Sequence, residues 1–134
     1  RTGKTTANGA GDICAQTVEA QKLLDWFCVE LKRGYQTASI SDLLDSKNGG
    51  TMRSFIDQAA RSAKVAKAPF WILLHKRNRR DTVVLTNCTW FTIGGAVYIR
   101  TECSNDDVFC LKYSDCFTRK ARNIVQGKMQ AYGA

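Results

Sequence analysis

The chain has 134 residues, among them 20 Lys or Arg and 12 Asp or Glu, so its formal net charge is +8 and its pI is near 9.4. A hydrophobic content of 44% is enough for the core of one domain, and the longest apolar run, 68–74, is far shorter than the roughly 20 residues that cross a bilayer. The composition excludes a membrane-spanning, collagenous or disordered chain, and the positive charge indicates either an anionic partner such as nucleic acid or a soluble domain that is merely basic.

The six cysteines indicate a reducing compartment. None of them forms a Cys-x-x-Cys pair and His75 is the only histidine, so a structural zinc site has weak support. A chain of this length can bury a core without disulfides, and no signal peptide is visible. We therefore expect the cysteines to act mostly as small buried hydrophobic residues.

The first part of the chain alternates polar connections with two short strands. Residues 1–11 are Gly-rich and polar, which is typical of a mobile loop, and residues 12–17 can form a short strand. A polar connection over 18–25, partly helical or turn, leads to a strand over 26–32, where apolar and polar residues alternate with period two. Gly34 ends this strand.

The middle of the chain carries the strongest pattern. After a loop over 35–50, apolar residues recur at helical spacing and predict an amphipathic helix over 52–67 with Thr51 as its cap. The apolar positions are Met52, Phe55, Ile56, Ala59, Ala60 and Ala63. The continuous apolar run 70–75 is typical of a strand buried on both faces, so these elements predict a strand–helix–strand unit with the strand at 26–32.

The last part predicts further strands and a basic helix. The expected elements are a basic turn at 76–80, a strand at 82–86, a hairpin formed by 89–93 and 96–101 around Gly94-Gly95, a strand at 108–113 and a helix at 118–132. No repeat or linker divides the chain, so we expect one α/β domain over residues 1–134.

Two charged side chains in the first apolar strand point to chemistry. Glu30 and Lys32 are two residues apart, so the pleat directs both to one face. A carboxylate that binds a hard divalent cation, beside an ammonium group, suits metal-assisted phosphodiester hydrolysis; the alternative is a solvated charge pair. A second acid is needed, and Asp12, at the start of the preceding strand, is the first candidate, ahead of Glu19 and Asp25.

Asp12 followed by VELKRGY at 29–35 resembles the PD-(D/E)xK nuclease superfamily, especially the phage and prokaryotic branch related to Holliday-junction resolvases. In that family the Asp starts the second core strand and the Glu-x-Lys lies on the third, and the following helix and buried strand match 52–67 and 70–75. The resemblance covers about residues 1–86. It implies a restriction-endonuclease-like α/β core, a central mixed sheet flanked by helices, here with a C-terminal β-hairpin region and helix.

The resemblance also implies roles for five residues. Asp12 and Glu30 would be metal ligands, the backbone carbonyl of Leu31 would supply a further ligand, and Lys32 would activate water or stabilise charge. Gln58 occupies a helix position where some members have a Gln near the active centre; otherwise it is an ordinary polar residue on a helix face. The implied cofactor is Mg²⁺, with Mn²⁺ as a substitute, and no organic cofactor is implied.

The chain departs from the family pattern at two points. Gly11 stands where the family name has Pro. Many members also carry an acidic residue on an N-terminal helix, and the chain starts at Arg1, too late to show one. The resemblance implies that this helix was removed, is supplied from elsewhere or is absent.

The expected location is the cytoplasm of a prokaryotic or phage-infected cell.

Basic residues in several segments are expected to contact a DNA backbone, although charge runs are often only solvated faces. These residues are Lys4, Arg33, Lys76, Arg77, Arg79, Arg80, Arg119 and Lys120. Nothing resembles a base-reading helix, which favours selectivity for DNA shape over sequence.

The sequence thus predicts a metal-dependent DNA endonuclease that is selective for branched DNA such as a Holliday junction. Paired symmetric cuts need a homodimer, for which the region 89–101 or the C-terminal helix could supply the surface. Two alternatives stay open, a non-catalytic basic DNA-binding protein and a structural or assembly protein of a phage particle.

Overall fold

A strand–helix–strand unit forms one side of the sheet, as the hydrophobic pattern predicts. The computed structural model describes residues 11–35, 37–44, 50–103 and 106–133, so the expected loop at 1–11 lies outside the described residues apart from Gly11. Its elements in chain order are α1 (Val18–Trp26), β1 (Phe27–Arg33), η2 (Ile40–Leu44), α2 (Gly50–Ala66), β2 (Phe70–Lys76), β3 (Val83–Thr86), η3 (Thr89–Thr92), β4 (Tyr98–Cys103), β5 (Asp106–Lys112), α3 (Tyr113–Cys116) and α4 (Arg119–Gly133).

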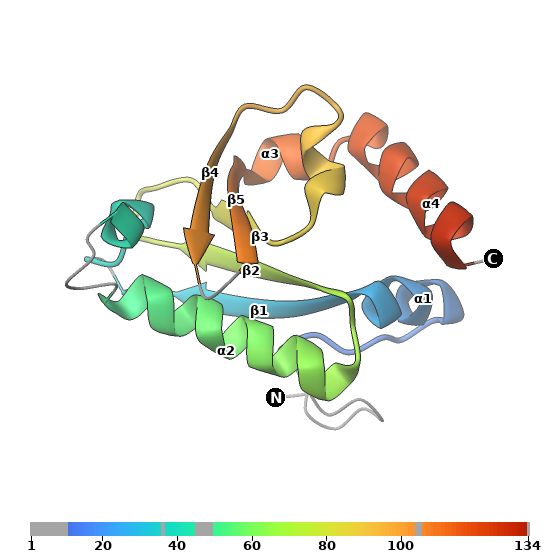
Figure 1. Ribbon diagram of the computed structural model, residues 1–134, viewed down its shortest axis with the longest axis horizontal. Helices are drawn as coiled ribbons and strands as arrows, with labels where there is room; N and C mark the ends of the chain where they lie inside the picture. Colours follow the sequence, from blue (N-terminus) through green and yellow to red (C-terminus); the bar gives the residue numbers. More distant parts are fainter. Residues whose placement is uncertain (1–10, 36, 45–49, 104–105, 134) are drawn as a thin grey trace.

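The strands form one five-stranded mixed sheet in the order β1-β2-β3-β5-β4 (Figure 1). β1 and β2 are parallel, in register from Phe27 opposite Phe70 to Arg33 opposite Lys76, which confirms the predicted unit. All other neighbouring strands are antiparallel. Because β1 is the first and β4 the last strand in this order, they are the two edges of the sheet.

Helices cover both faces of the sheet (Figure 1). On one face, α2 packs on β1 and β2 through its apolar stripe, including Met52, Phe55 and Ala59. On the other face, η3 and α4 pack over a second cluster that contains Phe27, Trp90 and other buried side chains. The chain is therefore an α/β fold with a C-terminal helix, as expected.

The expected hairpin around Gly94-Gly95 is wrong. Residues 89–92 form the short 3₁₀ helix η3 instead of a strand, because Trp90 and Phe91 turn together into the second core cluster. Two neighbouring residues cannot both face the core from a strand, where side chains alternate. The C-terminal hairpin is formed by β4 and β5.

The expected strand at 12–17 is also wrong, because residues 11–17 are irregular. The next segment is a regular helix, α1, with Thr17 as its N-cap, whose hydroxyl accepts a hydrogen bond from the Ala20 N–H at 3.0 Å. In α2 the predicted cap is wrong as well: Gly50, with φ of +57°, makes the turn into the helix, and Thr51 lies inside the first turn.

Two expectations from composition are met within the described residues. Five of the six cysteines are buried and all six are free thiols, Cys14 being partly exposed. Helices long and apolar enough to cross a bilayer are missing from the described part of the chain.

Candidate active site

Asp12 lies against the outer edge of β1, although it is not part of a strand. Its backbone N–H donates to the Val29 carbonyl at 2.8 Å, and its carboxylate oxygen Oδ2 accepts from the Leu31 N–H at 2.8 Å. These two bonds satisfy backbone groups that an edge strand otherwise leaves open. Asp12 is thus fixed next to Glu30, as predicted, by a turn and not by strand pairing.

Gly11 makes this approach sterically allowed. Its φ is +82°, and a Cβ at this position would lie 3.0 Å from the Cys28 sulfur and 3.1 Å from the Val29 carbonyl oxygen. Proline, which stands here in the family pattern, cannot adopt a positive φ. Gly11, where the family pattern has proline, therefore allows a backbone conformation that places Asp12 against β1.

Glu30 is a buried carboxylic acid, with only 3% of its surface exposed. Its side chain is hydrogen-bonded to the Ser62 hydroxyl and to the Asp12 carboxyl. Burial raises the pKa of Glu30 above its ordinary value; the Ser62 hydrogen bond lowers it, Asp12 raises it further through its hydrogen bond and charge, and the Lys32 ammonium lowers it. Two carboxyl groups in such contact require a proton or a cation between them.

Lys32 is held by two groups of α2. Its Nζ donates to the Gln58 Oε1 at 2.8 Å and lies 5.0 Å from the centroid of the Phe55 ring. The amide oxygen and the ring face both attract the ammonium group and restrict a side chain that is otherwise flexible. Gln58 therefore contacts the lysine of the Glu-x-Lys motif.

The Leu31 carbonyl lies on the same edge as Asp12. The backbone N–H and C=O of one strand residue point to the same side, and the Leu31 N–H is directed at Asp12. The side chain of Leu31 is 45% exposed, although the period of two places it on the same face as Phe27 and Val29. Phe27 and Val29 reach the second core cluster, and Leu31 does not.

The oxygen donors at this edge suit a hard divalent cation. In the described residues no group of three or more His, Cys, Asp or Glu side chains could hold a metal ion. The two carboxyl groups and the Leu31 carbonyl fit Mg²⁺, which commonly uses one or two carboxylates and keeps water or phosphate oxygens as its other ligands. Cys28 lies beside them, but burial and then the charges of Glu30 and Asp12 raise its pKa to about 11, so it stays a neutral thiol.

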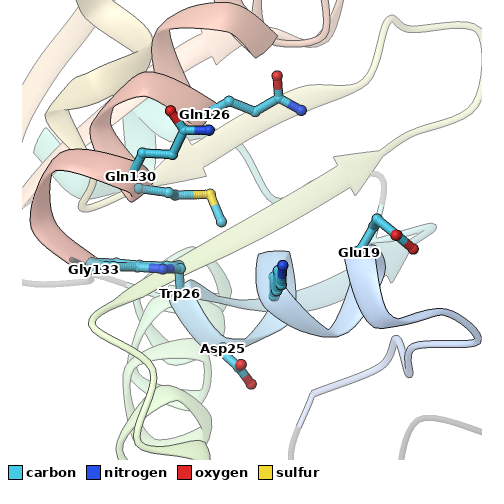
Figure 2. A pocket seen from close by; sticks show the side chains of 8 residues that line it. Glu19, Asp25, Trp26, Gln126, Gln130 and Gly133 are labelled. Atoms are coloured by element: carbon cyan, nitrogen blue, oxygen red, sulfur yellow. The ribbon is translucent and has the colours of Figure 1, made fainter.

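The two other acids considered as second ligands lie elsewhere. Glu19 and Asp25 are on α1 and line a groove of about 640 Å³ between α1 and α4 (Figure 2). Asp25 accepts a hydrogen bond from the Gln21 side chain at 2.8 Å. The structure therefore selects Asp12 as the partner of Glu30.

The basic turn after β2 lies at the same end of the sheet as the Glu-x-Lys motif. Arg33 is opposite Lys76, and the Gly34 N–H donates to the Lys76 carbonyl at 3.0 Å. Lys76 turns its ammonium group to the carbonyls of Arg77 and Arg80, where it stabilises the turn. The side chains of Arg79 and Arg80 are exposed beside it.

The remaining predicted DNA contacts are not brought to this end. Arg119 and Lys120 begin α4, which covers the sheet face opposite α2, so the sheet separates them from Lys32. Lys4 lies outside the described residues.

Sequence reasoning missed Ser62 and Phe55. Both share a helix face with Gln58, at spacings of four and three residues, and that spacing alone could have identified them.

No family model matches the chain, and no curated protein and no solved structure matches it significantly. Membership of the PD-(D/E)xK superfamily therefore stays a prediction.

Proposed function

We propose that the protein is a Mg²⁺-dependent DNA endonuclease with a restriction-endonuclease-like core of the PD-(D/E)xK type. The observation that carries the proposal is the contact between Asp12 and the buried Glu30, two residues from a Lys32 that is itself anchored by Gln58. A buried carboxylic acid in contact with a second carboxyl group is costly to the fold unless a proton or a cation compensates it.

Each residue has a defined task in this proposal. A divalent ion at the site would polarise the scissile phosphate and lower the pKa of an attacking water. Asp12, Glu30 and the Leu31 carbonyl hold that ion, and the Ser62 hydroxyl orients the Glu30 carboxylate. The Lys32 ammonium orients the water or stabilises negative charge on the phosphate in the transition state. The resemblance to the PD-(D/E)xK superfamily implies a product with a 5′-phosphate.

The position of the basic groups supports a nucleic-acid substrate. Arg33 and the turn that contains Arg79 and Arg80 lie at the carboxyl ends of β1 and β2, beside Lys32. Phosphate contacts of this kind position a backbone without reading bases. We therefore propose selectivity for DNA structure, with branched DNA such as a Holliday junction as the preferred class.

The test is a cleavage assay on a four-way junction, a linear duplex and a single strand of the same sequence. We expect a Mg²⁺-dependent product that EDTA abolishes, and we expect Lys32→Ala and Glu30→Ala to bind DNA but not to cut it. The matched control is Lys64→Ala, which removes an exposed lysine from α2 and should cut like the wild type. Wild-type rates for both site variants would contradict the proposal.

The same assay tests the alternative of a non-catalytic DNA-binding protein. Salt-sensitive binding by the wild type, with no product at any Mg²⁺ or Mn²⁺ concentration, would support that alternative. A product confined to the junction would support the proposed structure selectivity.

A further inference from the structure

The outer edge of the sheet, at β4, exposes large apolar side chains. Val97, Tyr98 and Ile99 are consecutive, and 76%, 45% and 56% of their respective surfaces are exposed. Ile99 lies on the same sheet face as α2, which packs chiefly on β1 and β2. Apolar residues in such numbers on an edge strand favour pairing with another strand.

The backbone of β4 has one partner. Among the described residues β4 pairs only with β5, from Tyr98 opposite Leu111 to Cys103 opposite Asp106. Its other side therefore presents a row of N–H and C=O groups that a further strand can bind. At the β1 edge the corresponding groups of Val29 and Leu31 are taken by Asp12.

Among the described residues of one copy, one acidic side chain of β4, Glu102, lacks a partner of opposite charge. Glu102 is directly opposite Asp107, a like-charge pair that is unfavourable across two strands. Arg100 donates to Asp107 at 3.0 Å, and within the described part of the chain Glu102 has no cationic partner. Arg100 and Glu102 lie two residues apart and share a face, with Thr101 between them.

We propose that β4 pairs antiparallel with β4 of a second copy, about a two-fold axis at Thr101. This register places Arg100 of each copy opposite Glu102 of the other copy, so each Glu102 gains the cation that it lacks. It also places Ile99 of each copy opposite Cys103 of the other. The two sheets join into one, and each copy keeps its own β1 edge at the far end.

A second copy fits this surface better than nucleic acid does. Residues 93–103 contain one Arg and one Glu and are neutral, although the whole chain carries a net charge of +8. Two neutral edges can approach without the repulsion that separates the basic surfaces, and they offer little attraction to phosphate. The strand is also self-complementary, which a two-fold interface requires.

The experiment measures the oligomeric state of the full chain by sedimentation velocity and light scattering, in EDTA and without DNA. We expect a dimer for the wild type and monomers for Arg100→Glu and for Glu102→Arg, because each single change places like charges opposite each other. The double variant R100E/E102R restores opposite charges in the same register and should be a dimer again. Arg122→Glu, the same charge change at an exposed position of α4, should leave the dimer intact.

Circular dichroism shows whether each variant is folded. If a charge variant fails to fold, Ile99→Lys serves as a second test, since a charge on an exposed apolar position of an edge strand blocks strand pairing without touching the core. A monomeric wild type overturns the proposal. So does a double variant that stays monomeric, or an Ile99→Lys variant that stays a dimer. Because no activity is measured, the result is independent of the proposed nuclease function.

Discussion

The two edge strands of the sheet, β1 and β4, differ in what covers their outer sides. At β1 a turn of the chain lies along the edge, and two acids meet there, one of them almost fully buried. At β4 the edge stays open to other strands among the described residues, and its charges are exposed, with Arg100 and Asp107 forming a surface ion pair. The arrangement at β1 lowers the stability of the fold and covers the edge, whereas the arrangement at β4 affects stability little and leaves the edge exposed.

This difference indicates where function lies. A surface ion pair contributes little to stability and can be exchanged at little cost. A buried acid in contact with a second acid opposes folding unless a proton or a cation compensates it. Among the described residues this unfavourable arrangement occurs at β1 alone, which agrees with the proposed cation site there.

The largest expected effect comes from Glu30→Gln. We expect it to abolish cleavage and, in EDTA at neutral pH, to raise the melting temperature. Burial raises the pKa of Glu30 in the folded state, so its contribution to stability is fully present below the unfolded pKa of about 4.3 and is lost as the pH rises through the folded pKa. The gain from Gln should therefore vanish when the melts are repeated in acid.

Glu19→Gln is the matched control away from both sheet edges. The Glu19 side chain is exposed on α1, so its substitution should alter neither the cleavage rate nor the pH dependence of melting. A lower melting temperature for Glu30→Gln than for the wild type at neutral pH would show that the Glu30 carboxylate stabilises the fold.

The next prediction compares two glycines with positive φ, Gly11 beside β1 and Gly95 before β4, to separate backbone strain from side-chain crowding. Gly11 and Gly95 have φ of +82° and +87°, but only a Cβ at Gly11 would crowd Cys28 and Val29; at Gly95 it would meet nothing within 4 Å. Gly95→Ala should cost about 1–2 kcal/mol of unfolding free energy and leave cleavage intact. Gly11→Ala should cost more and lower cleavage at least tenfold, because it displaces Asp12. Chemical denaturation and the cleavage assay measure both; equal costs and equal rates would contradict this account.

A smaller effect is expected from Gln58→Ala. Gln58 positions the Lys32 ammonium, so its loss should lower kcat by about 10–100-fold and leave KM nearly unchanged. Arg61→Ala, at an exposed position one turn along the same helix, is the control. A rise in KM with unchanged kcat would show that Gln58 contacts DNA instead.

The smallest effect is expected from the basic turn. Arg79→Ala and Arg80→Ala should each weaken binding for all DNA sequences alike and reduce the slope of log affinity against log salt by about one. Arg122→Ala on α4 should leave the slope unchanged. Lys76→Ala should lower the melting temperature, because this side chain stabilises the turn through backbone carbonyls. Unchanged slopes for both arginine variants would remove the turn from the DNA surface.

The local sequence pattern predicted those elements whose apolar residues recur with a regular period. The helix at α2, the buried strand β2 and the shared face of Glu30 and Lys32 follow from periods of 3.6 and 2 residues. The errors fell where a long-range contact overrides the local pattern: Trp90 and Phe91 turn together into the core as η3, and Asp12 reaches Glu30 without a strand.

The amino-acid sequence by itself determined which residues carry the charge, which segments are amphipathic and in which order they come, because these are properties of neighbours along the chain. Tertiary structure decided that Ser62 and Asp12 meet at Glu30, that Gln58 and Phe55 hold Lys32, and that β4 is left as an open edge. Those contacts join residues that are far apart in the chain, and only the packing of α2 and the strand order bring them together.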